Sequence, residues 1–189
     1  MTRTSGGHVN YSVPSLTTPQ EWRNYLSHYS EQHLCTAGEH ELAALTAEQR
    51  VMRWLGYEAA AEEEVSAAEQ RLGVDLPPSF RSFLLTSDGW DGIGGWVERV
   101  LPSARLSWMR HTEGGRRLIG GTGATSRDQA LLRLLKSSLK VAGAENIWLL
   151  DPTDTDSDGE WAAYLFDQEH GGREKFPSFA HLFYANRLV

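Results

Sequence analysis

The sequence predicts an α+β fold: a mixed, mostly antiparallel sheet packed by helices, with an N-terminal helical extension. Apolar residues at helical spacing fill the first half of the chain. Runs that are apolar on both faces, typical of covered strands, appear at residues 146–150 and 160–166. The order is helices, then strands, one inserted helix, more strands and a final helix, which differs from a repeating βαβ layout.

Two capping boxes predict where the first helices begin. The stretch TTPQEW at 17–22 opens a helix that is expected to end near residues 34–38. Thr46 with Gln49 opens a second, short helix that stops near Gly56.

Two further helices are predicted before residue 90. AEEEVSAAEQRLG at 61–73 places acids in its first turn, where the helix dipole favours them, and ends on Gly73 as a C-terminal cap. Pro77 and Pro78 open the next helix, which SDGW at 87–90 ends in a turn.

The pattern changes after Gly92. Alternation in LPSARLSWMRH at 101–111 predicts a half-buried strand, and the stretch at 116–129 is expected to be a loop with at most a very short strand. Ser126 with Gln129 opens a helix whose apolar face extends to Leu139. A last helix is entered through Pro177.

Composition restricts the classes of function. The chain has 189 residues, 40% of them hydrophobic, and a net charge of −7, so it has enough apolar residues for a core, and general nucleic-acid binding is disfavoured. Residues 95–140 are nevertheless basic. We find no membrane-spanning stretch and no signal-peptide pattern, and the single Cys35 forms no internal disulfide. These features predict a cytoplasmic protein.

The stretch DPTDTDSDGEW at 151–161 allows three interpretations. A calcium loop needs a bidentate glutamate at its twelfth position, and counting from Asp154 that position is the apolar Leu165. A solvated turn between two strands is the simplest alternative. The third is an acidic loop that attracts a basic partner.

A second acidic site is SDGWDG at 87–92. Trp90 stands between Asp88 and Asp91. It is either a core residue that closes the turn or an anchor for a basic partner, because tryptophan is enriched at binding hot spots.

Other chemical motifs are weak. Cys35 lies near His33 and His40, but a buried structural thiol is the favoured interpretation. IGGTGATS at 119–126 lacks the GK[ST] ending of a phosphate loop. The basic stretch 99–117 fits either RNA contact or a salt-bridged sheet surface. The sequence therefore predicts no catalytic, cofactor-binding or metal-binding residues.

Two blocks, at 54–90 and 147–183, together resemble the SUKH superfamily, which is named for bacterial immunity proteins and a fungal regulator of cell-wall assembly. The first contains the pattern LG-x-x-LP, an aromatic residue, FL and a polar-Gly turn, and the second contains a strand, an acidic turn, GEW, a strand and SF. The matching residues of the first block are Glu69, Leu72, Gly73, Leu76, Pro77, Phe80, Phe83 and Leu84. The resemblance implies a mixed α+β fold, no enzymatic activity and, in many members, neutralisation of a cognate toxin, often a nuclease.

The predicted organisation is a flexible tail at 1–14 and a single SUKH-like domain at 15–189, with a helical extension at 15–53 and a core at 54–189. The predicted function is a non-enzymatic immunity protein that binds a protein partner, a toxin with a basic surface, and occludes it with acidic loops. No nucleic acid, membrane, cofactor or metal is expected. The predicted partner-binding residues are Asp88, Trp90, Asp91, Trp96, Asp154, Asp156, Asp158 and Glu160.

Two alternatives remain open from the sequence. One is a regulatory or scaffolding protein of the same fold without a toxin partner, which makes contact through the N-terminal helices and the Arg-rich middle. The other is an enzyme or metal protein, which requires converging polar side chains.

Overall fold

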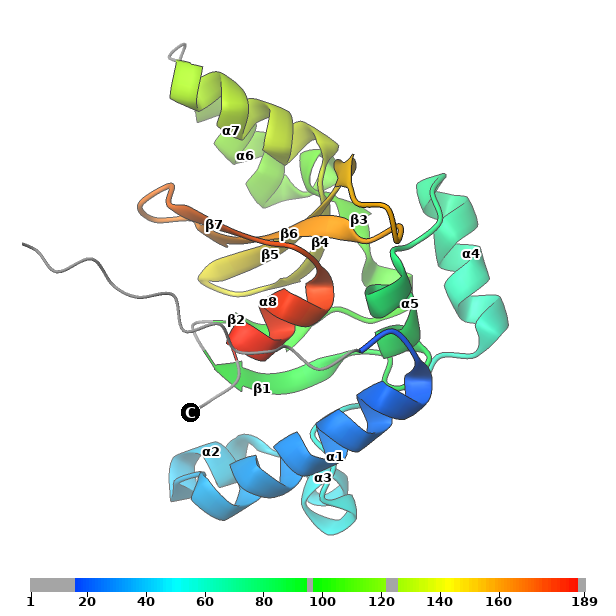
Figure 1. Cartoon of the computed structure of the whole chain (residues 1–189). Helices are drawn as coiled ribbons and strands as arrows, with labels where there is room; N and C mark the ends of the chain where they lie inside the picture. The colour runs from blue at the N-terminus through cyan, green and yellow to red at the C-terminus, as the bar shows by residue number, and fades with distance from the viewer. Residues whose placement is uncertain (1–15, 95–96, 122–125, 187–189) are drawn as a thin grey trace, which may run out of the picture.

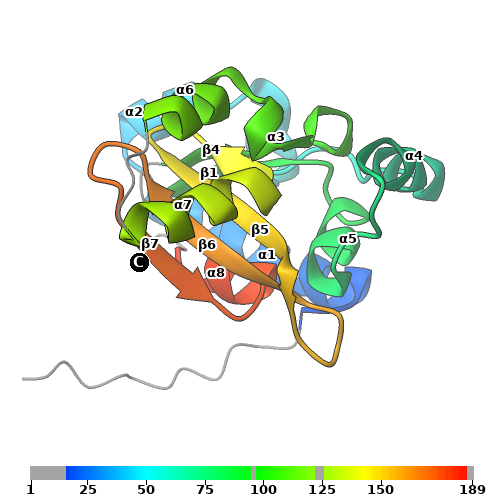
Figure 2. The same cartoon turned by 90° about the horizontal axis from the view of Figure 1, so that it is seen from above.

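The structure is a computed structural model that describes residues 16–94, 97–121 and 126–186. The described elements form an α+β fold, in which a seven-stranded antiparallel sheet carries helices on both faces (Figures 1 and 2). The predicted fold class is therefore confirmed. The tail predicted at 1–14 lies outside the described residues.

The N-terminal helices begin where the capping boxes predict. In both boxes the threonine side chain accepts a hydrogen bond from the N3 amide, and the N3 side chain accepts one from the cap amide. Trp22 is fully buried and donates from its indole nitrogen to the carbonyl of Ser79 at 2.8 Å, which ties the first helix to the fifth. The two helices with capping boxes are α1 (Pro19–Thr36) and α3 (Ala47–Met52), and between them lies the short α2 (Glu39–Ala44), which the sequence did not predict.

Helices α4 (Glu62–Leu72) and α5 (Pro78–Leu84) follow as predicted. Gly73 ends α4 with φ of 73°, a left-handed conformation that glycine adopts without strain. The buried residues of α4 are Val65, Ala68 and Leu72, which form one stripe.

The sheet has the order β1-β2-β4-β5-β6-β7, and β3 also pairs with β4. Every pairing is antiparallel. β7 lies at one end of this order and pairs with β6. The strands are β1 (Trp90–Gly94), β2 (Val97–Val100), β3 (Ser107–Trp108), β4 (Leu139–Gly143), β5 (Asn146–Thr155), β6 (Trp161–Asp167) and β7 (Arg173–Phe176).

Side chains alternate along β5 between two hydrophobic clusters. Ile147 and Leu149 pack in the smaller cluster, on the face that α6 (Glu113–Gly121) and α7 (Ser126–Ser137) cover (Figure 1). Trp148 and Leu150 pack in the larger cluster, which α1, α5 and α8 (Phe179–Ala185) share on the other face. The predicted covered strands are thus present and are buried on both faces.

The prediction of a strand at 101–111 is wrong for most of this segment. Only β3 is extended, between short 3₁₀ turns at Ser103–Arg105 and Met109–His111. The Arg71 guanidinium donates to the carbonyl oxygens of Ser103 and Leu106 at 2.9 and 2.7 Å. Because a side chain of α4 takes these carbonyl groups, the segment coils onto α4 instead of extending a strand ladder.

The prediction of a loop at 116–129 is also wrong, because its first residues belong to helix α6. Four glycines in α6 lower its intrinsic helix propensity, and Leu118 and Ile119 stabilise the helix by packing on the smaller cluster. Leu139, predicted on the face of the following helix, belongs to β4. Among the helices of the described residues, none has both the length and the apolar character needed to cross a bilayer.

Candidate partner-binding site

The acidic turn, defined here as residues 154–158, connects β5 to β6 at the surface. Asp156 Oδ1 accepts hydrogen bonds from the amides of Asp158 and Glu160, both at 2.9 Å, and Gly159 has φ of 82°. Asp154 accepts a hydrogen bond from Lys175 Nζ at 2.6 Å, with both side chains about half exposed. The structure therefore holds the three aspartates in an ordered turn and leaves them exposed.

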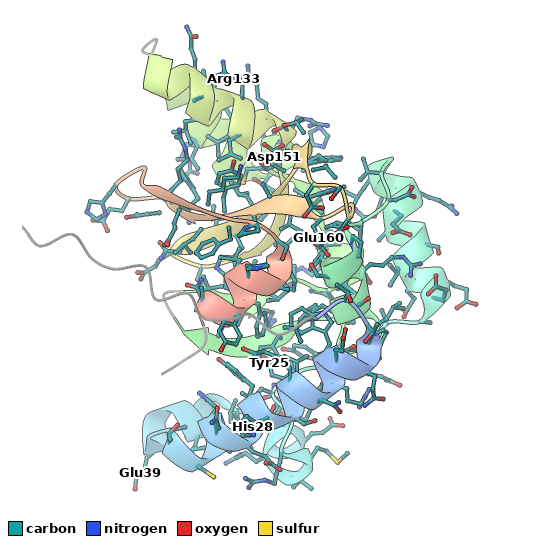
Figure 3. All side chains as sticks on the ribbon, viewed as in Figure 1. Tyr25, His28, Glu39, Arg133, Asp151 and Glu160 are labelled. Carbon is teal, nitrogen blue, oxygen red and sulfur yellow. The ribbon has the colours of Figure 1, made fainter. Side chains whose placement is uncertain are left out.

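Glu160 does not belong to this exposed set, and its predicted contact with a partner stays a prediction. Its side chain turns inward (Figure 3) and accepts hydrogen bonds from the Ser79 amide and hydroxyl, both at 2.7 Å; the residue is 8% exposed. Burial raises the pKa of the Glu160 carboxyl, although the Ser79 hydrogen bonds act in the opposite direction. Glu160 instead caps the first turn of α5.

Trp90 is fully buried, so the expectation that it anchors a partner is wrong for the structure described. Its ring packs edge-on against Trp54 and Tyr29, with centroid distances of 5.0 and 6.0 Å. Neighbouring Asp88 is half-buried and accepts hydrogen bonds from the Ser103 amide and hydroxyl at 2.6 and 3.2 Å. This site therefore closes a turn, which is the core interpretation of SDGWDG.

Asp91 lies at the centre of a polar network, and its carboxylate accepts hydrogen bonds from side chains of the same chain. Arg99 Nε donates to Asp91 Oδ1 at 2.6 Å, and Gln49 Nε2 and the Tyr57 hydroxyl donate to Oδ2. Burial and the hydrogen bond to Asp91 raise the pKa of Tyr57 to about 12. The Asp91 carboxylate thus holds three side chains from three segments in place.

Two other sequence expectations have simple outcomes. Trp96 lies outside the described residues. Cys35 is exposed, contrary to the buried thiol that we expected. Across the described ranges, no group of three or more His, Cys, Asp and Glu side chains is arranged to hold a metal ion.

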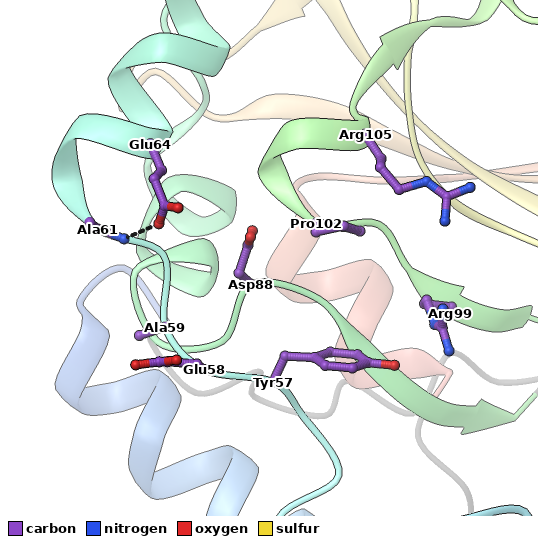
Figure 4. Close-up of a pocket in the computed structure, with 9 residues that line it drawn as sticks. All are labelled: Tyr57, Glu58, Ala59, Ala61, Glu64, Asp88, Arg99, Pro102 and Arg105. Carbon is purple, nitrogen blue, oxygen red and sulfur yellow. Dashed lines mark hydrogen bonds between the residues drawn. The ribbon is translucent and has the colours of Figure 1, made fainter. Parts of the chain in front are cut away.

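Sequence reasoning missed two neighbouring cavities that are both lined by the segment Tyr57–Ala59; we call this shared segment the floor and the two cavities together the groove. Two cavities of about 650 and 900 Å³ share this floor. Figure 4 shows the smaller one, between the start of α4 and the segment at 99–105. No motif marks the groove in the sequence. Its one local signal is three apolar residues, Val51, Met52 and Tyr57, that the structure leaves exposed.

The two predicted acidic loops lie at opposite ends of α5. Gly159, next to the acidic turn, approaches Pro78 at the start of this helix, and Asp88 follows its end. Asp88 lines the smaller cavity, whereas Asp154 and Asp156 line a separate hollow beside Lys175. The candidate site residues therefore form two separate surfaces.

Comparison with known proteins gives one informative match. No curated protein matches the chain significantly. A family model, described as SMI1 / KNR4 family (SUKH-1), matches residues 59–184, which is more than half of the chain. The matched region includes α4, α5, the sheet, the acidic turn and α8 except its last residue. The chain therefore belongs to the SMI1 / KNR4 family (SUKH-1).

Proposed function

We propose that this chain is an immunity protein that binds and occludes a cognate bacterial toxin. Membership of a generally non-catalytic family supports an immunity- or regulator-like module. The observation that carries the toxin proposal is the acidic turn, which presents Asp154, Asp156 and Asp158 at the surface in a fixed conformation. A nuclease is the toxin class that fits best, because its substrate-binding cleft is basic.

The acidic turn acts mainly on the rate of encounter. Exposed charges near the rim of an interface attract an oppositely charged partner over roughly a Debye length, about 8–10 Å at physiological salt. Each such charge adds little to the final affinity, because solvent screens it. The proposed binding surface has fewer available carboxylates than the sequence predicted, because Asp91 and Glu160 accept internal hydrogen bonds.

The test first looks for a toxin gene next to this one and then measures binding to the toxic domain that it encodes. Asp154→Asn with Asp158→Asn removes two charges and keeps Asp156, whose carboxylate orders the turn. We expect the association rate constant at low salt to fall by about 3- to 10-fold, with a smaller change in the dissociation rate. Surface plasmon resonance at two salt concentrations measures both.

The matched control is Glu145→Gln with Glu169→Gln, which removes two exposed charges from turns outside the proposed surface. The control should keep the native association rate, apart from a small effect of net charge. Equal rates for the two double variants would contradict the electrostatic role of the acidic turn. Failure of the native chain to bind or neutralise the neighbouring toxin would contradict the proposed function itself.

A second candidate is a regulatory or scaffolding protein without a toxin partner. The observation that favours it is a basic surface on α6 and α7, where Arg116, Arg117, Arg133 and Lys136 are exposed. Arg133 projects from α7 on the side of the sheet opposite to α8 (Figure 3). The absence of a toxin gene next to this one would favour this candidate.

A further inference from the structure

The groove combines exposed apolar side chains with a fixed aromatic wall. In the part of the chain that the structure describes, the exposed large hydrophobic residues are Val51, Met52 and Tyr57, with exposed fractions of 79%, 69% and 38%. All three fall within seven residues, and Met52 and Tyr57 line the groove. Trp54 lines it too. Apolar and aromatic groups gathered beside a concave surface are typical of binding hot spots.

The walls of the groove are held in place before any partner binds. The Arg99 guanidinium lies over the Tyr57 ring, 5.5 Å from its centroid. The Asp91 carboxylate accepts a hydrogen bond from each of these two side chains. Gly56 approaches the Trp90 ring so closely that an added Cβ would lie 2.5 Å from Cε3. Such a preorganised surface loses little conformational entropy on binding.

The charge that remains available in the middle of the groove is negative. Glu48 and Glu58 line the groove, and within the described residues neither carboxylate has a hydrogen-bonding or ion-pair partner. By contrast, Arg23 lies over the Trp54 ring at 5.7 Å and Arg99 is paired with Asp91. Arg105 lies in the wall opposite Glu58 and Glu64 (Figure 4), so the side with Glu48 and Glu58 is the one that complements a cation.

The backbone of the floor also has hydrogen-bonding capacity. Glu58 and Ala60 bond to Asp88 and Leu84 on one side of the segment, through the Glu58 carbonyl and the Ala60 amide. The amide and carbonyl of Ala59 form no hydrogen bond within the described residues. An extended peptide satisfies such groups with its own backbone.

We infer that this groove is the docking site for an extended peptide segment of a protein partner, in which an apolar side chain is followed by a lysine or arginine. The apolar side chain packs against Met52, Trp54 and Tyr57. The cation pairs with Glu48 and Glu58. The inference rests on the proposed function only for the identity of the protein that carries this segment.

The test uses random 12-residue peptides displayed on phage and selected against the full-length chain. Enriched peptides should combine an apolar or aromatic residue with Lys or Arg. A synthetic copy of the most enriched peptide is then titrated into the chain, with Trp fluorescence or amide chemical shifts as the readout. Residues 54–59 are expected to shift on binding.

The decisive variant is Met52→Gln with Glu58→Lys, which alters two exposed side chains that no internal contact requires. Peptide affinity should fall at least about tenfold, roughly 1.4 kcal/mol. Glu145→Lys, on the exposed β4–β5 turn, is the matched control and should stay within about twofold. Thermal unfolding midpoints of both variants should match the native chain.

Three results would overturn the inference: no enriched peptide, enriched peptides that are acidic, or equal affinity for the native chain and the groove variant. None of them depends on the toxin. If the native chain neutralises the toxin while the groove variant binds the toxin equally well but loses the peptide, the proposed function and the groove both stand, and the toxin is excluded as the protein that carries the segment.

Discussion

Asp158 and Glu160 lie two residues apart in sequence and occupy opposite surroundings. Asp158 is exposed, whereas Glu160 is buried against Ser79, 81 residues earlier in the chain. The sequence predicts an acidic turn at the right place, because local composition determines it. It does not reveal which carboxylate turns inward, because the donor that selects Glu160 is distant in sequence. Trp90 is a similar case, since only packing with Trp54 and Tyr29 decides its burial.

Removing the Glu160 carboxylate should destabilise the fold. Glu160→Ala leaves the buried Ser79 amide without its acceptor, which costs about 1–3 kcal/mol of the free energy of unfolding. Glu160→Gln keeps an acceptor for this amide and should lose much less. Urea denaturation at neutral pH measures both, and equal losses for the two variants would contradict the role given to the hydrogen bond.

Comparing the native chain with Glu160→Gln also tests the direction in which the pKa of the Glu160 carboxyl is shifted. Because burial raises the pKa of the Glu160 carboxyl above its ordinary value, the folded state holds this proton more tightly than the unfolded state. The contribution of Glu160 to stability is therefore fully present below the unfolded pKa and is lost as pH rises through the folded pKa. Relative to Glu160→Gln, the native chain should lose stability as pH rises from about 4 towards 7. A difference that stays constant over this range would contradict the shift.

At the scale of elements, the helices that the sequence predicts correctly are those with local signals at their ends. α1, α3, α4 and α5 have caps or prolines at their ends, and each was found where those residues place it. The short strands β1, β2 and β7 and helix α6 lack such signals. α6 exists because Leu118 and Ile119 pack on the sheet, a tertiary effect that propensity does not contain.

Two adjacent glycines of α6 allow a test of the claim that packing, rather than intrinsic helix propensity, stabilises this helix. A Cβ at Gly114 meets nothing within 4 Å, whereas one at Gly115 would lie 2.6 Å from the Met109 carbonyl carbon. Gly114→Ala should therefore raise the free energy of unfolding by up to about 1 kcal/mol. Gly115→Ala should lower it by about 1–3 kcal/mol, because backbone atoms must move. Chemical denaturation compares them, and the same sign for both variants would contradict this account.

At the scale of the whole molecule, we propose that residues 15–189 form one domain, with residues 15–53 as its helical extension. Trp22 of α1 packs against Phe83 of α5 and Phe179 and Phe183 of α8, with centroid distances of 5.3–5.7 Å. The extension therefore contributes to the same hydrophobic cluster as the helices inside the family match.

A chain that begins at residue 54 should fail to fold cooperatively. It would expose the cluster that α1 covers, and replacing Trp22 alone by alanine already corresponds to a loss of about 3–5 kcal/mol. Circular dichroism during heating should show a broad transition or aggregation for the fragment and a single sharp transition for the full chain. A fragment that unfolds sharply near the native midpoint would show that the core at 54–189 is independent.

The charged edge strand β7 has a consequence for solubility. An open strand edge is a template on which another chain can extend the sheet, and β7 meets that risk with Arg173, Glu174 and Lys175 in succession, all exposed. A second copy aligned there would bring like charges together or strip water from them. Among the described residues, β7 can therefore end the sheet while its charges oppose the addition of a further strand.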